Sequence, residues 1–400
     1  MRVFLALILG LVTGVGGVFL ALVILAPQPA GERLRSPDGL GSLFSSPVSE
    51  ALGSSQDSNP NAPSAGLKPA DAKGSPTATI DAASALREYM LALINQDRSD
   101  NNLRPVALGT NSAAQIHADS MLRNGFLSHW GLDGLKPYMR FTASGGVNYA
   151  SENASGLPYS LKDGRRYQEV AAFQIVSNAQ LGLMQSPGHR KNILDEWHRS
   201  VSLGIACSSH TCSISQLFQG AYVQFEQEPR LDEGWLTMSG NLSDGFNPQG
   251  VQVWYDEPPH PLTLGQLGAT FAYGIGQQPA AFVRAPLPPQ MEHTGSTSKY
   301  SYEAGADPYK VDPSSPPPAP ICDGQTCKAP QRRQDTTIVT MAVTWVTAAR
   351  WEIEDGFFNV AADLTEHVER LGPGIYTVVL WAEKNGDPVD MTNYSVEVGR

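Results

Sequence analysis

The chain has 400 residues, of which 41% are hydrophobic and 17% charged, which is the composition of a folded protein with room for two or three domains. Its formal net charge is −11, and no run of basic residues occurs along it. Nucleic acids and anionic membrane surfaces are bound through clustered Lys and Arg. The charge therefore argues against a nucleic acid partner and disfavours attachment to an anionic surface.

Residues 1–26 are a candidate membrane anchor. No charged side chain occurs in residues 3–26, and a helix of that length can cross a hydrocarbon core of roughly 30 Å. A cleaved signal peptide is the alternative, but its apolar region is usually about 7–15 residues long, and Gln28 stands where the cleavage site needs a small residue. We expect a single-pass protein of the cell membrane with extracytoplasmic domains; the alternative is secretion after signal cleavage.

Residues 27–80 are rich in Pro, Ser, Gly and Ala and contain almost no aromatic residue. Such a segment cannot bury enough apolar surface to offset the entropy that ordering it would cost. We therefore expect a disordered tether between the membrane segment and the folded domains.

Residues 81–229 open with helical periodicity. Asp81 is a candidate N-cap, and the apolar residues within 85–94 recur on one face of a helix. A second helix is expected to begin at the cap Asn111, to bury Ala114, Ala118, Met121 and Leu122, and to end at the stop signal Asn124-Gly125.

The rest of this range mixes extended and helical patterns. We expect an extended segment at 149–154, a third helix at 167–184, and two strands at 201–207 and 212–218. Helices before and around a small antiparallel sheet predict an α+β layer structure.

The four cysteines occur as two close pairs, Cys207 with Cys212 and Cys322 with Cys327. In an exported chain each pair is expected to form a local disulfide. A metal site built from both pairs is the alternative, but such sites usually have closer spacings within one small module. We therefore expect two disulfides.

Residues 230–400 have a different pattern, with short β-rich segments separated by Pro and Gly. Segments 251–255, 337–346 and 374–381 are examples of the expected strands. We predict a β-rich, sandwich-like module, for which an immunoglobulin-like fold is one option. The pattern leaves open whether this range is one domain or two.

Three polar motifs follow one another in the first domain: Ser128-His129, then Ser151-Glu152-Asn153-Ala154, then Ser186-Pro187-Gly188-His189. Imidazole and carboxylate groups bind divalent metals and move protons near neutral pH, so a cleft that brings them together is a candidate site for either role. Each residue also has a structural interpretation. Glu152 could hold a loop by accepting backbone N–H groups, and His189 could stabilise a turn fixed by Pro187 and Gly188.

Other catalytic signals are weak. Ser128 and Ser151 lie near the histidines in sequence, but neither sits in a Gly-x-Ser-x-Gly elbow. The histidines outside the motifs show no ligand spacing, and we interpret them as surface or capping residues; they are at positions 117, 198, 210, 260, 293 and 367.

In this order, the three motifs resemble those of the CAP superfamily, which comprises cysteine-rich secretory proteins, antigen 5, pathogenesis-related class one and bacterial proteins with an SCP domain. The resemblance spans about residues 82–227. It implies a secreted domain of three α-β-α layers, with a cleft whose histidines and glutamates can coordinate a divalent cation. Carried over residue by residue, His129, Glu152 and His189 are the candidate ligands of zinc or another divalent cation, and Glu152 is also a candidate general base. The sequence departs from the animal and plant pattern at Ser213, which replaces a second sheet histidine, and at 186–189, which replaces a second glutamate.

The resemblance implies binding rather than enzymatic turnover, with lipid or sterol, glycan or a surface protein as ligand and a divalent-metal site in the cleft. Two alternatives remain open at this point. One is a metal-assisted, peptidase-like hydrolase acting on extracellular or cell-wall material. The other is a cell-surface scaffold or adhesin.

Overall fold

The computed structural model describes residues 82–399, apart from 157–171, 209–210, 271, 288–297, 305–306, 318–320, 324–325 and 329–336. The predicted membrane segment and tether lie outside the described residues. Within the described part of the chain, no helix is long and apolar enough to span a bilayer. Ile80–Arg400 forms one compact unit.

A four-stranded sheet organises the first part of this unit, as the α+β prediction requires. Its strands are β1 (Ala107–Leu108), β3 (Ser200–Cys207), β4 (Cys212–Gln219) and β2 (Ala150–Ser155), in that spatial order. β1 runs parallel to β3, and the other neighbours are antiparallel. β2 is therefore an edge strand.

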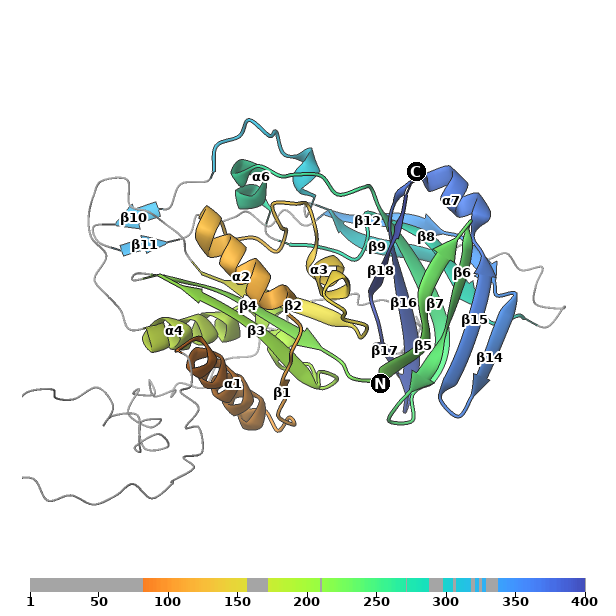
Figure 1. The fold of residues 1–400 in the computed structure, drawn as a ribbon, viewed down its shortest axis with the longest axis horizontal. Coiled ribbons are helices and arrows are strands. Elements are labelled where there is room, and N and C mark those ends of the chain that lie inside the picture. The colour runs from red at the N-terminus through yellow and green to blue at the C-terminus, as the bar shows by residue number, and fades with distance from the viewer. Residues whose placement is uncertain are drawn as a thin grey trace, which may run out of the picture. The chain divides into compact units, whose positions relative to one another are not determined.

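Helices cover both faces of this sheet (Figure 1). α1 (Ala82–Asp100) and α4 (Ala172–Gln185) pack together on one face, and α2 (Ala113–Asn124) and α3 (Pro137–Ala143) lie on the other. The periodic apolar face predicted for the first helix is buried: Met90 and Ile94 pack with Val176 of α4 and Phe218 of β4 in one core. This burial is what fixes α1 to the sheet.

The predicted end of α2 at Gly125 is confirmed, whereas the N-cap position is occupied by Ser112 and not by the predicted Asn111. The Asn111 side chain accepts a hydrogen bond from the backbone N–H of Ala113 at 3.0 Å, and Gly125 ends the helix in the left-handed conformation with φ of 69°. The turn expected at His189 is wrong. Pro187 instead begins a short helix, α5 (Pro187–Ile193), because proline suits the first helical position, where its missing N–H costs nothing.

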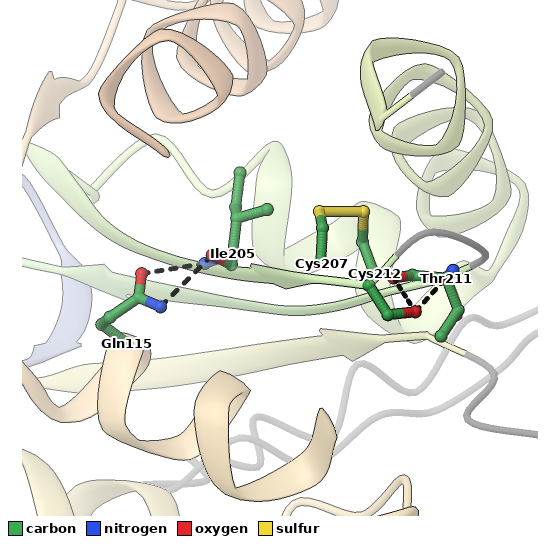
Figure 2. The surroundings of a disulfide bond; sticks show 6 residues. Gln115, Ile205, Cys207, Thr211 and Cys212 are labelled. Carbon is green, nitrogen blue, oxygen red and sulfur yellow. Dashed lines mark hydrogen bonds between the residues drawn. A yellow bond between two sulfur atoms is a disulfide. The ribbon is translucent and has the colours of Figure 1, made fainter. Parts of the chain in front are cut away.

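The Cys207–Cys212 disulfide forms as predicted and joins directly opposed residues at the end of the β3–β4 hairpin. Figure 2 shows it beside Gln115, which reaches the sheet from α2. The Gln115 amide accepts from the backbone N–H of Ile205 at 3.1 Å and donates to its carbonyl at 3.2 Å. Ile205 lies beyond the short strand β1, so this side chain takes the place of a neighbouring strand.

The second part of the unit is β-rich, as expected, and contains two large sheets. The four-stranded sheet has the order β14 (Arg350–Glu354), β15 (Phe357–Asp363), β6 (Trp235–Leu242), β5 (Val223–Asp232). The six-stranded sheet has the order β13 (Trp345–Thr347), β8 (Gln278–Arg284), β7 (Asn247–Asp256), β16 (Gly374–Lys384), β17 (Asp387–Asp390), with β18 (Tyr394–Val398) also pairing with β16. Residues of both sheets, including Leu236, Val253, Phe358 and Leu380, form one apolar core. Two sheets that share a core form a sandwich.

Smaller elements complete this module. They are α6 (Leu264–Ala269), η2 (Pro308–Lys310), α7 (Thr365–Leu371) and two strand pairs, β9 (Ser298–Ala304) with β12 (Thr337–Val343) and β10 (Ile321–Asp323) with β11 (Thr326–Lys328). The β10–β11 register places Cys322 opposite Cys327. That register is compatible with the second disulfide, which stays a prediction.

Candidate functional site

Glu152 is the centre of the candidate site. It lies on the edge strand β2 with its carboxylate buried. Arg140 of α3 donates to Oε2 at 3.1 Å, and the Ser215 hydroxyl donates to the same atom at 2.8 Å. His129 Nδ1 lies 3.0 Å from Oε1. Both carboxylate oxygens therefore have hydrogen-bond partners within the protein.

His129 lies in the loop after α2, and its side chain is 12% exposed. A carboxylate oxygen that accepts from Nδ1 fixes the tautomer of a neutral imidazole, with hydrogen on Nδ1 and the lone pair on Nε2. This arrangement, with a carboxylate behind a histidine, is the one that orients metal-binding histidines. The ring is therefore oriented to present Nε2 to a ligand.

His189 comes from α5 and lies beside His129, with their ring centroids 6.3 Å apart. Burial, together with the neighbouring His129, lowers the pKa of His189 to about 4. The ring is consequently neutral near pH 7, as a metal ligand or proton acceptor must be.

The structure thus brings the three predicted site residues together, but in unequal roles. Glu152 is bonded to His129 and to two other side chains, whereas the two imidazoles are the groups that remain for a cation. In the described part of the chain, no cluster of three or more His, Cys, Asp or Glu side chains has an arrangement that could hold a metal ion. A cation here would therefore be held by His129 and His189, with water or its ligand completing the coordination.

The charge on Glu152 is well stabilised. Burial opposes ionisation, but in the acid range where the carboxyl titrates, the protonated His117 ring, the Arg140 guanidinium and the hydrogen bond with His129 outweigh it and lower the pKa of Glu152 to about 2. A carboxylate with so low a pKa is a weak base near neutral pH. These surroundings suit an orienting role better than the general-base role considered from the sequence.

His117 is a site-lining residue that the sequence analysis placed wrongly. It is buried on α2, with Nε2 2.8 Å from the carbonyl oxygen of Ser128 and 3.9 Å from Glu152 Oε1. Burial is the main reason that the pKa of His117 is lowered to about 4. The predicted buried face of this helix contains Ala114 and Met121, and position 117 falls on that same face, so periodicity could have placed it.

Two other histidines assigned to the surface are also buried, His198 and His367. His198 stands next to the site strand, where its Nε2 lies 3.2 Å from the Ser151 hydroxyl. Ser151 donates to the Asn192 side chain, so this hydroxyl is part of a structural network. Arg140 and Ser215 had no signal in the sequence, because their common partner Glu152 is determined by tertiary packing.

A chain of side-chain amides fixes the position of β2 from within the core. Asn153 Nδ2 donates to Gln216 at 3.2 Å, Gln216 Nε2 donates to Gln180 at 2.7 Å, and Gln180 Nε2 donates to Asp97 at 2.7 Å. These contacts connect the residue beside Glu152 to β4, α4 and α1 in turn. Satisfied polar networks of this kind fix one arrangement of a core.

The sandwich module also contributes to the site. The Tyr273 hydroxyl accepts a hydrogen bond from the backbone N–H of Glu152 at 2.9 Å, and its ring centroid is 5.0 Å from that of His129. Burial raises the pKa of Tyr273 well above its usual value, so the phenol stays protonated. Nothing in the local sequence marks Tyr273, because its contacts are with the other part of the unit.

The first part of the unit is therefore a helix-covered sheet with the His129–Glu152 pair at its edge strand and His189 on α5. Residues 91–223 match the family model described as the Cysteine-rich secretory protein family, CAP. The chain therefore contains a CAP superfamily domain, and the resemblance inferred from the three motifs is confirmed.

Two solved structures are similar to parts of this chain. An extracellular protein containing an SCP domain from Bacillus anthracis str. Ames is 24% identical, with 35% of this chain and 41% of that chain covered and a TM-score of 0.28. An outer surface protein from Borrelia burgdorferi is 15% identical, with 34% of this chain and 94% of that chain covered and a TM-score of 0.28. This chain thus spans less than half of the Bacillus protein. No curated protein matches it.

Proposed function

We propose that this chain is an extracellular CAP-domain binding protein whose ligand is held at the His129–His189 pair, with a divalent cation such as zinc bound there. Its ligand would be a lipid or sterol, a glycan or a surface protein. The observation that supports this proposal most directly is the 3.0 Å contact between His129 Nδ1 and Glu152 Oε1. It orients one imidazole beside a second one, which is a donor set that suits zinc.

Binding is favoured over turnover because the other groups needed for hydrolysis are engaged elsewhere. Both oxygens of Glu152 accept hydrogen bonds, and the Ser151 hydroxyl is bonded to Asn192. Cys207 and Cys212 form a disulfide and supply no thiolate. A metal-assisted hydrolase would need a general base that the described residues around the imidazole pair do not leave free.

The first test is isothermal titration of zinc into the full chain. We expect roughly stoichiometric binding that is lost in the His129→Ala, His189→Ala double variant. His260→Ala is a matched control, because this exposed histidine lies in the sandwich module. Absence of zinc binding to the wild type, or equal binding by the double variant, would contradict the metal site.

The ligand class is tested with zinc-loaded and zinc-free protein against lipid vesicles, glycan arrays and surface proteins. We expect binding to at least one class, with an affinity that changes when zinc is removed. Turnover of a peptide library that His189→Ala abolishes would instead favour the hydrolase. Binding retained after the imidazole pair is removed would favour the scaffold.

We also propose that the folded unit lies outside the cytoplasm, anchored by residues 1–26 through the tether 27–80. The Cys207–Cys212 disulfide supports this proposal, since such bonds persist in oxidising compartments. Protease added to intact cells should release the folded unit by cutting the tether, whereas a secreted protein would appear in the medium with a new N-terminus.

A further inference from the structure

The free edge of β2 is completed by side chains from the sandwich module. The Asn393 amide accepts from the backbone N–H of Ala150 at 3.1 Å and donates to its carbonyl at 2.8 Å. Two residues further on, the Tyr273 hydroxyl accepts from the N–H of Glu152 at 2.9 Å. The strand that carries Glu152 therefore depends on the sandwich module for these outward hydrogen bonds.

Tyr273 contacts both members of the His129–Glu152 pair. Its hydroxyl holds the backbone of Glu152, and its ring packs against the His129 ring at a centroid separation of 5.0 Å and an interplanar angle of 58°. Removing the hydroxyl frees the Glu152 N–H, whereas removing the ring also frees one side of the imidazole. A single side chain thus constrains both ends of the hydrogen bond on which the proposed site depends.

The backbone on each side of Tyr273 is held by CAP residues that follow His129 in the chain. Trp130 Nε1 donates to the carbonyl of Ala272 at 3.2 Å, and Lys136 Nζ donates to the carbonyl of Gly274 at 3.0 Å. Lys136 also forms a buried ion pair with Asp256 at 2.7 Å. These contacts fix the Tyr273 side chain in place, since its two neighbours along the chain cannot move independently of the CAP domain.

We propose that Tyr273 is a positioning residue of the CAP site, supplied by the sandwich module, so that the His129–Glu152 pair is held in its binding geometry only while the two parts are docked. This inference rests on the proposed function for the identity of the site, but the hydrogen bond to Glu152 can be tested without any ligand. The CAP domain and the sandwich then form one composite binding unit.

The ligand-free test is amide hydrogen exchange, measured residue by residue by NMR on the full chain. In Tyr273→Phe we expect the Glu152 amide to exchange at least about tenfold faster, because its acceptor is lost. The Phe218 amide in the interior strand β4 should not change. Tyr309→Phe is the matched control, because that hydroxyl also contacts a backbone N–H, of His260 at 3.3 Å. Unchanged Glu152 exchange in Tyr273→Phe, or equal acceleration in Tyr309→Phe, would overturn the proposal.

The second test is zinc affinity of the same variants, with thermal melting to confirm that each one folds. We expect affinity to fall about tenfold in Tyr273→Ala, the lower end of the roughly 10–100-fold loss seen when a group that orients a metal ligand is removed. Tyr273→Phe keeps the ring and should lose less, about threefold. Tyr309→Phe should bind as the wild type does. Partial retention by Tyr273→Phe relative to Tyr273→Ala would show that the ring orients His129.

The two proposals fail in different ways. If the wild type binds no zinc but Glu152 exchange accelerates only in Tyr273→Phe, the metal function is wrong and the positioning role stands. If zinc binding and Glu152 exchange are both unaffected in the folded Tyr273 variants, the positioning role is wrong and the metal function stands.

Discussion

The interiors of the sandwich and of the CAP site differ in chemistry. The sandwich core is made of apolar side chains from two sheets, such as Leu236, Val251 and Phe358. Around the site, by contrast, Arg140, Glu152 and other charged or amide side chains are buried and hydrogen-bonded to one another. Apolar burial tolerates many arrangements, but each buried polar group requires a particular partner. The comparison indicates that apolar burial, in the sandwich and in the CAP core around Met90 and Phe218, provides stability, whereas the buried polar groups of the CAP site fix geometry.

The boundary between the two regions combines both kinds of contact. Trp130 shares an apolar cluster with Leu262, and Met139 shares one with Ile375. Lys136 and Asp256 form a buried ion pair across the boundary, and Asn393 bonds to the backbone of Ala150. Directional contacts of this kind fix one docked orientation and add less free energy than an apolar interface of equal size would. The following variants distinguish effects on the free energy of unfolding from effects on the geometry of the site.

The largest expected effect is in the sandwich. Phe358 is fully buried, and Phe358→Ala should lower the free energy of unfolding by about 4 kcal/mol through the cavity it leaves. Chemical denaturation measures the loss, and zinc titration below the transition should show unchanged affinity in the folded fraction. A large loss of zinc affinity in Phe358→Ala would contradict the separation between the stabilising sandwich core and the site.

A smaller loss is expected at the site. Glu152→Gln removes the charge that compensates the buried Arg140 guanidinium, and should cost about 3 kcal/mol in unfolding free energy. Unlike Phe358→Ala, it should also weaken zinc binding, because His129 loses its orienting carboxylate. Glu228→Gln, an exposed glutamate of the sandwich, is the control. Equal effects in the two variants would mean that the buried charge pair contributes little.

The CAP region should lose stability as the pH falls, whereas the buried Asp390 of the sandwich, whose pKa burial raises to about 6, contributes with the opposite sign. The folded-state pKa of His117 is lowered to about 4, so its contribution is complete above its ordinary pKa of 6.5 and is lost as the pH falls towards 4. Glu152, with its pKa lowered to about 2, adds a second loss as the pH falls from 4.5 to 2.

Unfolding at a series of pH values should therefore show a decrease of about 3 kcal/mol from His117 between pH 6.5 and 4. His117→Gln keeps a donor for the Ser128 carbonyl and should flatten that part of the profile. A profile identical to that of the wild type would show that His117 is not responsible.

The smallest effect is expected at the boundary. Asn393→Ala leaves the backbone N–H and carbonyl of Ala150 without their partner and should cost about 1 kcal/mol. Thermal melting measures it, with exposed Asn247→Ala as control. A loss as large as that of Phe358→Ala would mean that docking, and not the sandwich core, dominates stability.

Local signals in the sequence predicted much of the CAP fold. Periodicity located α1, Gly125 marked the end of α2, and the cysteine spacing indicated the disulfide between β3 and β4. These signals work because they concern neighbours along the chain. The cap predicted at Asn111 is one residue before the observed N-cap, Ser112. The same local reasoning misread Pro187, which begins a helix where a turn was expected.

The candidate site was predicted only as far as its motifs extend. His129, Glu152 and His189 lie in short recognisable motifs. Arg140, whose guanidinium forms an ion pair with Glu152, lies in no such motif. Tyr273 could not be predicted at all, since its role depends on how the sandwich docks against β2. His117 is the instructive error, because a lone histidine was assigned to the surface although its helix face was predicted to be buried.

The amide side chains of Gln115 and Asn393 limit the pairing of the CAP sheet with strands of other molecules. Each occupies backbone groups at an open edge of the CAP sheet, on β3 and on β2. An uncovered edge of this kind can recruit a strand from another molecule and begin aggregation. A chain truncated before residue 393 would expose the β2 edge, so Asn393, just before β18, also shields this edge from pairing with a strand of a second molecule.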